Sequence, residues 1–472
     1  MNTSVKVVLS SLLSRRLCTR PLHRVRQIQK SFLGTSSEDG SDPTNEVARP
    51  PVHRPSFADS LRKAREDAAS KKEHSAQGSS SSESSSSSDS SEEDDSLLGK
   101  REPADLFGKS AKSRITSQDM FMTEQSDPSE HAMDYEGIYY IVSQEDQTRF
   151  FPSFIDSHYR IQARTFGGLY LMIRKPALEI IDIIKKSSYN CPLPKFIVYG
   201  KRGGGKTSTI SHVMHYCGKQ NHMLLNIPLV NDWIRARTNT TPSTSKAGFT
   251  NIPEQAQKWI SHFAALNAPL IKDMKVTKSI EWTKKEVTEA GSPLQSLIDF
   301  GLLRQKYADD VVDMLLDEVM TCATENKFKV LLVIDGLNGF YQPTNMREPL
   351  QPQRFIHAEK LCLVDSFKRI LNSGNKNVVA VCTVNEELRK LNERVKFTPF
   401  YLLGKEASQE LEPFVPIQVE NFSDMEVKNC LDFYSQRKWI QNSAALTDEG
   451  RKQIKFLTSN NPYAVWKVAG AY

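Results

Sequence analysis

The sequence contains no apolar run near the length that crosses a bilayer, and its seven cysteines are scattered without a Cys-x-x-Cys pair. A transmembrane helix needs about 20 consecutive apolar residues, so we expect a soluble body with no membrane span. Zinc sites and disulfide-stapled secreted domains use closely spaced cysteines, and neither is expected. Scattered cysteines usually act as small buried apolar residues, and they are typical of proteins in a reducing compartment.

Acidic residues are missing from residues 1–34, which hold seven of the 62 Lys and Arg residues. Without this segment, 55 basic residues face 56 acidic ones, a net charge of −1 in place of +6. That balance excludes a protein whose whole surface binds nucleic acid, while local basic patches stay open. An Arg-rich, Ser-containing, acid-free start is typical of a mitochondrial transit peptide, which we predict for residues 1–34; an ordinary basic tail is the alternative.

Aromatic and apolar residues are scarce in residues 35–134. Eleven of the thirteen residues from 79 to 91 are serines, and four acidic residues follow them. Such a composition buries too little apolar surface to offset the entropy of ordering, so we predict a disordered Ser- and acid-rich segment. Two functions stay open for it, a solvated spacer and a phosphoserine switch.

The composition becomes globular from about residue 135. Short apolar runs of the buried parallel-strand type alternate with helical spacing. The expected strands are residues 196–199, 223–227, 330–334, 378–383 and 414–419, and the clearest helices are 176–184, 210–217, 294–303, 311–320 and 361–371. We predict an α/β fold of the P-loop NTPase type in residues 135–400, a parallel sheet with helices on both faces. A helical insertion around residues 259–291 and a smaller, mostly helical region at 401–472 complete it.

A glycine-rich motif joins the first expected strand to a helix. Residues 200–207 read Gly-Lys-Arg-Gly-Gly-Gly-Lys-Thr and match G-x-x-x-x-G-K-T. Glycines let successive backbone N–H groups turn toward phosphate oxygens, and the helix directs its positive end at the anion. Lys206 is expected to reach the β- and γ-phosphates. The predicted nucleotide-binding residues are Gly200, Lys201, Arg202, Gly203, Gly204, Gly205, Lys206, Thr207 and Ser208. Gly218 is expected to cap the helix that follows.

An acidic residue at the end of a neighbouring strand is the second part of such a site. Asp335 follows the run 330–334, and we predict that it holds Mg²⁺ together with Thr207; a turn residue is the alternative. Gly336 stands where hydrolytic members of this class place a glutamate, and Asn338 can orient water without accepting its proton. Thr383 or Asn385 can contact a γ-phosphate or act as caps. We therefore predict no catalytic residue and at most slow hydrolysis.

The base of the nucleotide is not readable from these residues. Positions 375–378 read Asn-Lys-Asn-Val and lack the acid of an Asn-Lys-x-Asp guanine clamp, which slightly favours adenine. Two segments place a tryptophan beside basic residues, 233–237 and 282–285, and these are candidate RNA contacts. The alternative for each is a tryptophan that anchors the core beside solvated cations.

Several blocks between about residue 139 and the end of the chain resemble the death-associated protein family, the GTP-binding protein of the mitochondrial small ribosomal subunit. The blocks are GKRGGGKTSTISHVMHYCGKQ, NIPLVNDWIRAR, WTKKEVTEAGSPLQSLIDFGLLR, LLVIDGLNGF, YLLGKE and LEPFVPIQVENF. The resemblance implies GTP or GDP as the ligand. Site residues carry over to Gly200, Gly203, Gly205, Lys206, Thr207 and Asp335.

The resemblance also implies a place for the protein. Its partners would be mitochondrial small-subunit ribosomal proteins, with local contacts to mitochondrial rRNA and contacts toward the large subunit, in the mitochondrial matrix. An association with apoptosis belongs to the same family. The resulting hypothesis is a structural GTP- or GDP-binding ribosomal protein that supports mitochondrial translation. The alternative is a stand-alone matrix P-loop NTPase that acts as a switch or motor.

Overall fold

The computed structural model describes most of the chain after residue 120. The described residues are 121–151, 157–187, 189, 192, 194–235, 238–348, 353–388 and 396–471. The predicted transit peptide and all of the predicted disordered segment up to residue 120 lie outside them.

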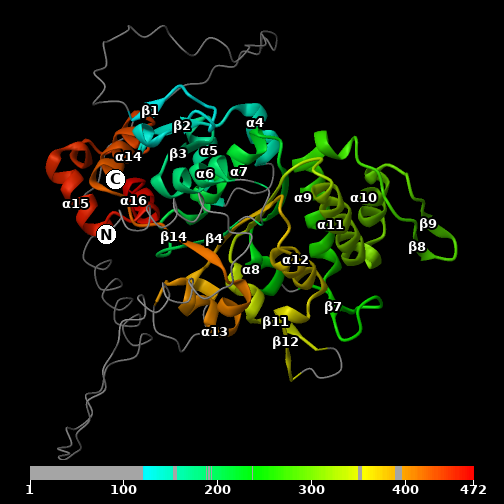
Figure 1. The fold of residues 1–472 in the computed structure, drawn as a ribbon. Helices are drawn as coiled ribbons and strands as arrows, with labels where there is room; N and C mark the ends of the chain where they lie inside the picture. Colours follow the sequence, from blue (N-terminus) through cyan, green and yellow to red (C-terminus); the bar gives the residue numbers. More distant parts are fainter. Residues whose placement is uncertain are drawn as a thin grey trace, which may run out of the picture. The chain divides into compact units, whose positions relative to one another are not determined.

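A five-stranded parallel sheet forms the centre of the fold, in the spatial order β14-β4-β13-β10-β5 (Figure 1). The strands are β4 Lys195–Tyr199, β5 Met223–Ile227, β10 Val330–Ile334, β13 Val378–Thr383 and β14 Phe414–Gln418. They agree with the expected runs to within one residue, and the α/β prediction is confirmed. Strand β14 joins the sheet from beyond residue 400, while the domain boundary placed there stays a prediction.

The strands alternate their side chains between two cores. Leu331 and Val333 of β10 belong to the core that contains α6 (Lys175–Lys186) and α7 (Lys206–Lys219), whereas Leu332 and Ile334 belong to the core of the opposite face. The helices of that opposite core are α8 Val230–Arg235, α9 Pro253–Ile271, α10 Leu294–Leu303, α11 Ala308–Thr324, α12 Cys362–Asn372 and α13 Pro399–Leu411. Because both faces are covered, β10 is apolar throughout, and β5 and β13 each carry a single polar residue, the buried Asn226 and Thr383.

The segment expected to be a helical insertion holds most of α9 and also an antiparallel hairpin. The hairpin consists of β8 (Ile280–Thr283) and β9 (Glu286–Thr288), and it projects beside α10 in Figure 1. Trp282 of β8 packs on Phe300 of α10, with ring centroids 4.8 Å apart. This stacking attaches the hairpin to the helices that follow it.

A third core joins the two ends of the described chain. A small sheet of β1 (Met122–Thr123), β2 (Tyr139–Ile141) and β3 (Tyr170–Met172) packs against the C-terminal helices. Those helices are α14 Asp424–Gln436, α15 Asp448–Thr458 and α16 Pro462–Ala469. Tyr139 stacks on Phe433, with ring centroids 4.3 Å apart. The C-terminal helices therefore depend on residues that precede the central sheet.

The expectation that Gly218 caps α7 is wrong. The helix continues to Lys219, and Gln220 is its C-cap. Gly218 is needed for another reason: a Cβ there would lie 2.5 Å from a ring carbon of Phe150, in α4 (Gln144–Phe150). Glycine thus allows α4 and α7 to approach closely.

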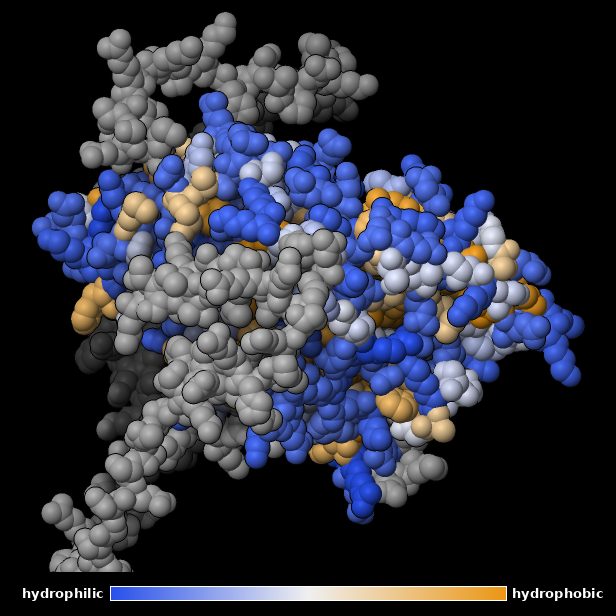
Figure 2. Space-filling view, in the orientation of Figure 1, coloured by the Kyte–Doolittle hydropathy of each residue, from blue (hydrophilic) through white to orange (hydrophobic). Residues whose placement is uncertain are grey.

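The hydrophilic surface and the buried cysteines agree with the expectations from the amino-acid composition. In the described part of the chain, no helix is long and apolar enough to cross a membrane. Figure 2 shows a face that is mainly hydrophilic, with small separate hydrophobic areas. The cysteines described in this part, each buried and with a free thiol, are Cys217, Cys322, Cys362, Cys382 and Cys430. They act as small apolar core residues, as expected.

Candidate nucleotide site

The glycine-rich loop leaves the carboxyl end of β4 and enters α7 directly. Gly203 and Gly205 adopt φ values of 74° and 98°, in the left-handed region that favours glycine. A Cβ on Gly200 would lie 2.2 Å from the carbonyl oxygen of Val419, so a side chain there would displace the backbone that follows β14. The loop therefore forms a compact backbone cradle that side chains at these positions would obstruct.

Lys206, the first residue of α7, lies inside this cradle. Its side chain is 9% exposed, and Nζ donates to the carbonyl oxygens of Gly200 at 2.9 Å and Lys201 at 3.2 Å. Burial lowers its pKa, and the nearby carboxylate of Asp335 acts in the opposite direction. The ammonium group is thus held at the loop by two carbonyl oxygens.

Asp335 connects the loop helix to two strands of the sheet. Thr207 Oγ1 donates to Asp335 Oδ2 at 2.8 Å, and Thr383 Oγ1 donates to Asp335 Oδ1. The N–H of Gly336 in turn donates to Thr383 Oγ1 at 2.9 Å. The structure therefore brings together Thr207, Asp335 and Thr383, from α7 and the carboxyl ends of β10 and β13. The Thr207 hydroxyl and the Asp335 carboxylate are the oxygen ligands that Mg²⁺ prefers.

Asn338 and Asn385 have a different arrangement from the one considered in the sequence. Asn338 is fully buried, its Nδ2 donates to the carbonyl of Asn385 at 2.9 Å, and its Oδ1 accepts from the N–H of Asn385 at 2.8 Å. This reciprocal pair fixes the segments after β10 and β13 to each other. Asn338 is therefore a structural residue, with its amide directed at the backbone.

Two glutamates contact Arg202 on the outer side of the loop. Glu386 Oε2 accepts a hydrogen bond from the backbone N–H of Arg202 at 3.1 Å, and the Arg202 guanidinium pairs with Glu387 Oε1 at 2.6 Å. Both glutamates belong to the short helix η6 (Glu386–Leu388) after β13. A carboxylate thus uses one of the N–H groups of the phosphate-binding motif. Sequence analysis missed this contact, which joins residues 184 positions apart.

A buried arginine at the N-cap of α6 contacts the backbone of the loop. Arg174 Nη1 donates to the carbonyl of Gly204 at 2.7 Å, and its Nε donates to Glu426 Oε1 at 2.8 Å. Its Nη2 donates to the carbonyl of Glu420 at 2.9 Å. The two charged side chains are only 6% and 5% exposed. Arg174 therefore links the loop, the end of β14 and the first turn of α14.

The C-terminal helices reach the same loop. Asn461 Nδ2 donates to the carbonyl of Arg202 at 2.9 Å, and the N–H of Tyr463 donates to the carbonyl of Gly203 at 3.1 Å. A Cβ on Gly203 would lie 2.7 Å from Asn461 Oδ1 and from Tyr463 Cβ. The start of α16 is thus fitted to the glycine backbone. Neither Arg174 nor Asn461 has a local sequence signal that points to the loop.

The remaining predicted residues lie where the motif places them. Lys201 and Arg202 are exposed, Gly204 is buried, and Ser208 is half-buried in the first turn of α7. The two tryptophans proposed for RNA contact pack on other parts of the fold. Trp233 is 5% exposed and lies 5.6 Å from Phe367 between ring centroids, and the half-buried Trp282 stacks on Phe300 and donates from Nε1 to Thr288 Oγ1 at 2.9 Å. These contacts support the alternative in which each tryptophan anchors the fold.

Comparison with known proteins gives the family. A family model described as "Mitochondrial ribosomal death-associated protein 3" matches residues 171–468. The chain is 31% identical to the small ribosomal subunit protein mS29 of Mus musculus over 340 residues, covering 72% of this chain and 86% of the mouse protein. The Bos taurus protein of the same name is 31% identical over 341 residues, covering 72% and 85%.

Among solved structures, the chain aligns with one in "Structure of E. coli MS115-1 HORMA:CdnC:Trip13 complex". That alignment has 11% identity and a TM-score of 0.25, over 71% of this chain and 94% of the other, too low to bear on the site. The family match and the mammalian relatives confirm the resemblance of the sequence blocks. The chain therefore belongs to the mitochondrial ribosomal death-associated protein 3 family.

Proposed function

We propose that the protein is a structural nucleotide-binding component of the mitochondrial small ribosomal subunit that supports mitochondrial translation. The observation that carries the proposal is the similarity to two small ribosomal subunit proteins, which extends over 72% of the chain. The family match, over residues 171–468, spans the glycine-rich loop. Its partners are then small-subunit ribosomal proteins, with local contacts to rRNA and contacts toward the large subunit, in the mitochondrial matrix.

The proposed ligand is GTP or GDP with Mg²⁺. The residues proposed to hold its phosphates are those of the loop and the first turn of α7, from Gly200 to Ser208, with Lys206 as the cation. The glycine backbone, which side chains would obstruct, and the buried Lys206 fit a phosphate group. Thr207 and Asp335, with oxygens 2.8 Å apart, fit the oxygen shell of Mg²⁺. The choice of guanine rests on the family alone.

Slow hydrolysis or none is part of the proposal. The carboxylates described near the loop are those of Asp335, bonded by two threonine hydroxyls, and of Glu386 and Glu387, bonded to Arg202. Each is engaged, and Gly336 follows Asp335 where a catalytic glutamate is usual in this class. A ligand that binds only the folded state stabilises it by about 4 kcal/mol at a thousandfold excess over its Kd. Turnover is unnecessary for that effect.

The test is the variant Lys206→Ala, because Lys206 is the buried cation of the loop. We expect loss of bound nucleotide, a lower Tm, and a smaller fraction of the protein sedimenting with small-subunit rRNA in gradients of mitochondrial lysate. Lys405→Ala, at an exposed position of α13, is the matched control. Full incorporation of a nucleotide-free Lys206→Ala protein would contradict the structural role. Turnover of about 1 s⁻¹ or more by the purified protein, in the enzyme range, would instead favour the stand-alone NTPase.

A further inference from the structure

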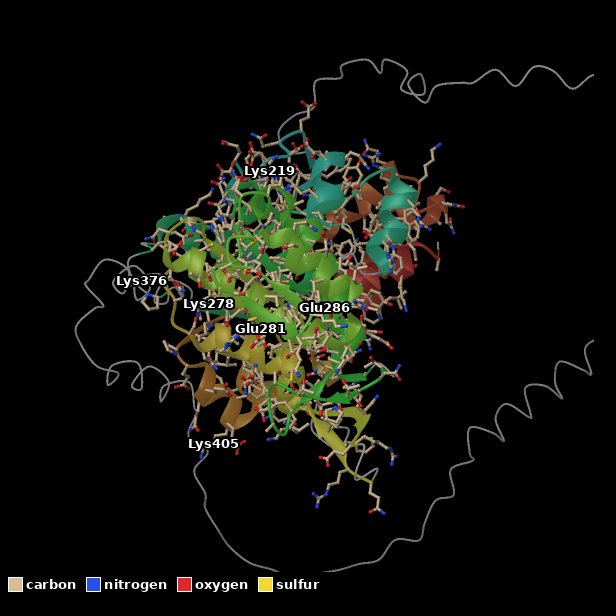
Figure 3. All side chains as sticks on the ribbon, turned by 90° about the vertical axis from the view of Figure 1, so that its right-hand side faces the viewer. Lys219, Lys278, Glu281, Glu286, Lys376 and Lys405 are labelled. Carbon is tan, nitrogen blue, oxygen red and sulfur yellow. The ribbon has the colours of Figure 1, made fainter. Side chains whose placement is uncertain are left out.

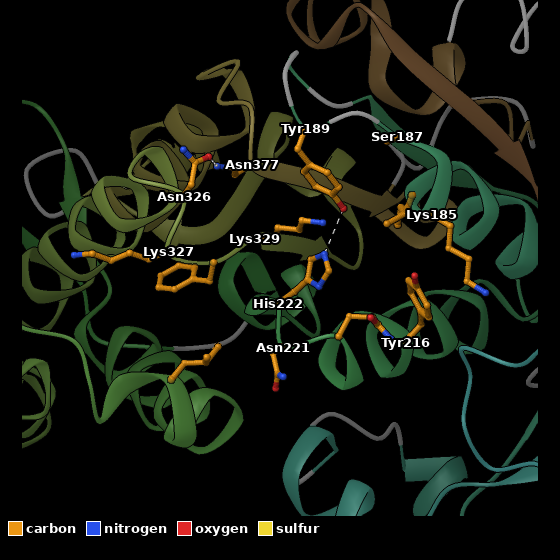
Figure 4. A pocket seen from close by; sticks show the side chains of 14 residues that line it. Lys185, Ser187, Tyr189, Tyr216, Asn221, His222, Asn326, Lys327, Lys329 and Asn377 are labelled. Carbon is orange, nitrogen blue, oxygen red and sulfur yellow. Dashed lines mark hydrogen bonds between the residues drawn. The ribbon is translucent and has the colours of Figure 1, made fainter. Parts of the chain in front are cut away.

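A pocket lies at the amino ends of the central strands, at the end of the sheet opposite the glycine-rich loop. Its volume is about 690 Å³, within the range of small-ligand pockets. The parallel register places His222, Lys329 and Asn377 side by side, each directly before a strand. The N–H of Met223 donates to the carbonyl of Lys329 at 2.7 Å, and the N–H of Val330 donates to that of Asn377 at 2.8 Å. Figure 4 shows the side chains around this hollow.

The lining of this pocket carries positive charge. Lys185, Lys327 and Lys329 line it, and the described lining residues include no Asp or Glu. Lys327 pairs with Glu325, but both side chains are more than half exposed, so that pair contributes little. Because the residues outside 1–34 are nearly balanced in charge, a lining with cations and no carboxylate is a local basic patch. It is suited to a phosphate group.

Aromatic rings accompany these cations. Tyr189, Tyr216 and Phe328 line the pocket, and Lys329 Nζ lies 3.6 Å from the ring centroid of Tyr189. His222 donates from Nδ1 to the carbonyl of Cys217 at 3.1 Å, and its Nε2 lies 3.5 Å from the Tyr189 hydroxyl. Burial lowers the pKa of His222 to about 4, so its ring is neutral at pH 7. The pocket thus combines ring faces, cations and a neutral hydrogen-bonding group.

We propose that this pocket binds an unpaired nucleotide of single-stranded RNA, with its phosphate on Lys329 and its base among the rings of Tyr189, Tyr216 and Phe328. Cations beside aromatic rings are the combination that holds single-stranded nucleic acid, since every base has a stacking face. The inference deepens the proposed ribosomal role and rests on it for the identity of the RNA as rRNA. The pocket and the glycine-rich loop lie at opposite ends of the sheet, so both ligands can be bound at once.

The test is fluorescence anisotropy of a labelled oligouridylate of about ten nucleotides, titrated with the purified protein at several salt concentrations. Lys329→Glu is expected to weaken binding at least tenfold and to reduce the slope of log K against log salt by about 0.7, the value for one phosphate contact on a single strand. Tyr189→Leu is expected to weaken binding about tenfold with an unchanged slope. Lys329→Gln removes the positive charge without adding a negative one. A reduced slope in this variant too would therefore come from lost attraction and not from added repulsion.

Lys405→Glu is the matched control, because Lys405 projects outward from α13 and does not line the pocket (Figure 3). Equal binding by Lys329→Glu, Tyr189→Leu and Lys405→Glu would overturn the proposal. So would uridine monophosphate that binds as tightly as the oligonucleotide, since the pocket would then be a mononucleotide site. Sedimentation of the same variants with the small subunit reports on the ribosomal role separately, because that role can fail while RNA binding in the purified protein persists.

Discussion

The carboxylate of Glu386 is bonded to the backbone N–H of Arg202, inside the motif that is expected to face phosphate oxygens. A carboxylate in that position is chemically similar to a phosphate oxygen, since both accept from the same donor. It also contributes to the negative potential that acts on Lys206, together with Asp335 and Glu387. Glu386 therefore opposes a further negative charge at the outer side of the loop.

Glu386→Gln should consequently tighten the binding of GTP. Removing one like charge about 4 Å from a phosphate in a solvated site changes its free energy by about 1 kcal/mol, roughly fivefold in Kd. Isothermal titration calorimetry with GTP and GDP measures the effect, and GTP, with the larger charge, should gain more. Glu281→Gln, at an exposed position of β8, is the control. Weaker GTP binding by Glu386→Gln would mean that the carboxylate assists the site.

The buried ion pair of Arg174 and Glu426 joins the start of α6 to the first turn of α14. Arg174→Met should destabilise the protein by about 3–5 kcal/mol, because it leaves Glu426 buried without its cation and removes a donor from the Gly204 carbonyl. Denaturant unfolding monitored by circular dichroism measures this loss. Arg304→Met breaks the more exposed pair with Glu286 and should cost less than about 1 kcal/mol. Similar losses in the two variants would show that the buried pair is not a joint between elements.

Elements of the central sheet were predictable from sequence because their signal is local. Strands β5, β10 and β13 are buried along their whole length, so their runs are almost entirely apolar, and they begin and end at the residues the pattern indicates. The reason for glycine at position 218 was not predictable, because it is the close approach of the Phe150 ring, 68 positions earlier in the chain. Local patterns locate an element, while its neighbours decide the purpose of single residues within it.

On the scale of the whole molecule, several buried histidines make stability depend on pH. Burial lowers the pKa of each of His131, His212, His215, His222 and His262. The unfolded chain, with ordinary values near 6.5, then binds more protons than the folded one between about pH 6.5 and 4. The stability due to these neutral rings is complete above about pH 6.5 and falls as the pH drops. Asp309, whose pKa is raised to about 7 by burial, offsets part of the loss.

His262→Gln should flatten this dependence. With a pKa of about 4 in the folded state, the single ring accounts for about 2 kcal/mol of stability lost between pH 7.5 and pH 5. Glutamine can keep the contact to Asn226, whose Nδ2 lies 3.0 Å from His262 Nε2. Free energies of unfolding at the two pH values measure the change. The same slope in His262→Gln as in the unchanged protein would refute the assignment; His357→Gln, with a side chain 43% exposed, serves as the reference variant.

The candidate site was predictable only in part, because some of its residues come from positions far from the motif in the sequence. The loop from Gly200 to Thr207 and the strand-end Asp335 have fixed motif positions, and the fold brings Thr207 and Asp335 into direct contact. Arg174, Glu386 and Asn461 reach the loop through tertiary packing and carry no spacing rule. Sequence reasoning therefore locates the glycine-rich loop and misses the side chains that fix its shape.

The contact between α16 and the loop has a consequence for biosynthesis. Asn461 bonds to Arg202 across 259 positions, so a polypeptide that ends after Thr207 but before Asn461 has the glycine motif and lacks this contact. The cradle is then completed only after the last helix has been translated and docked.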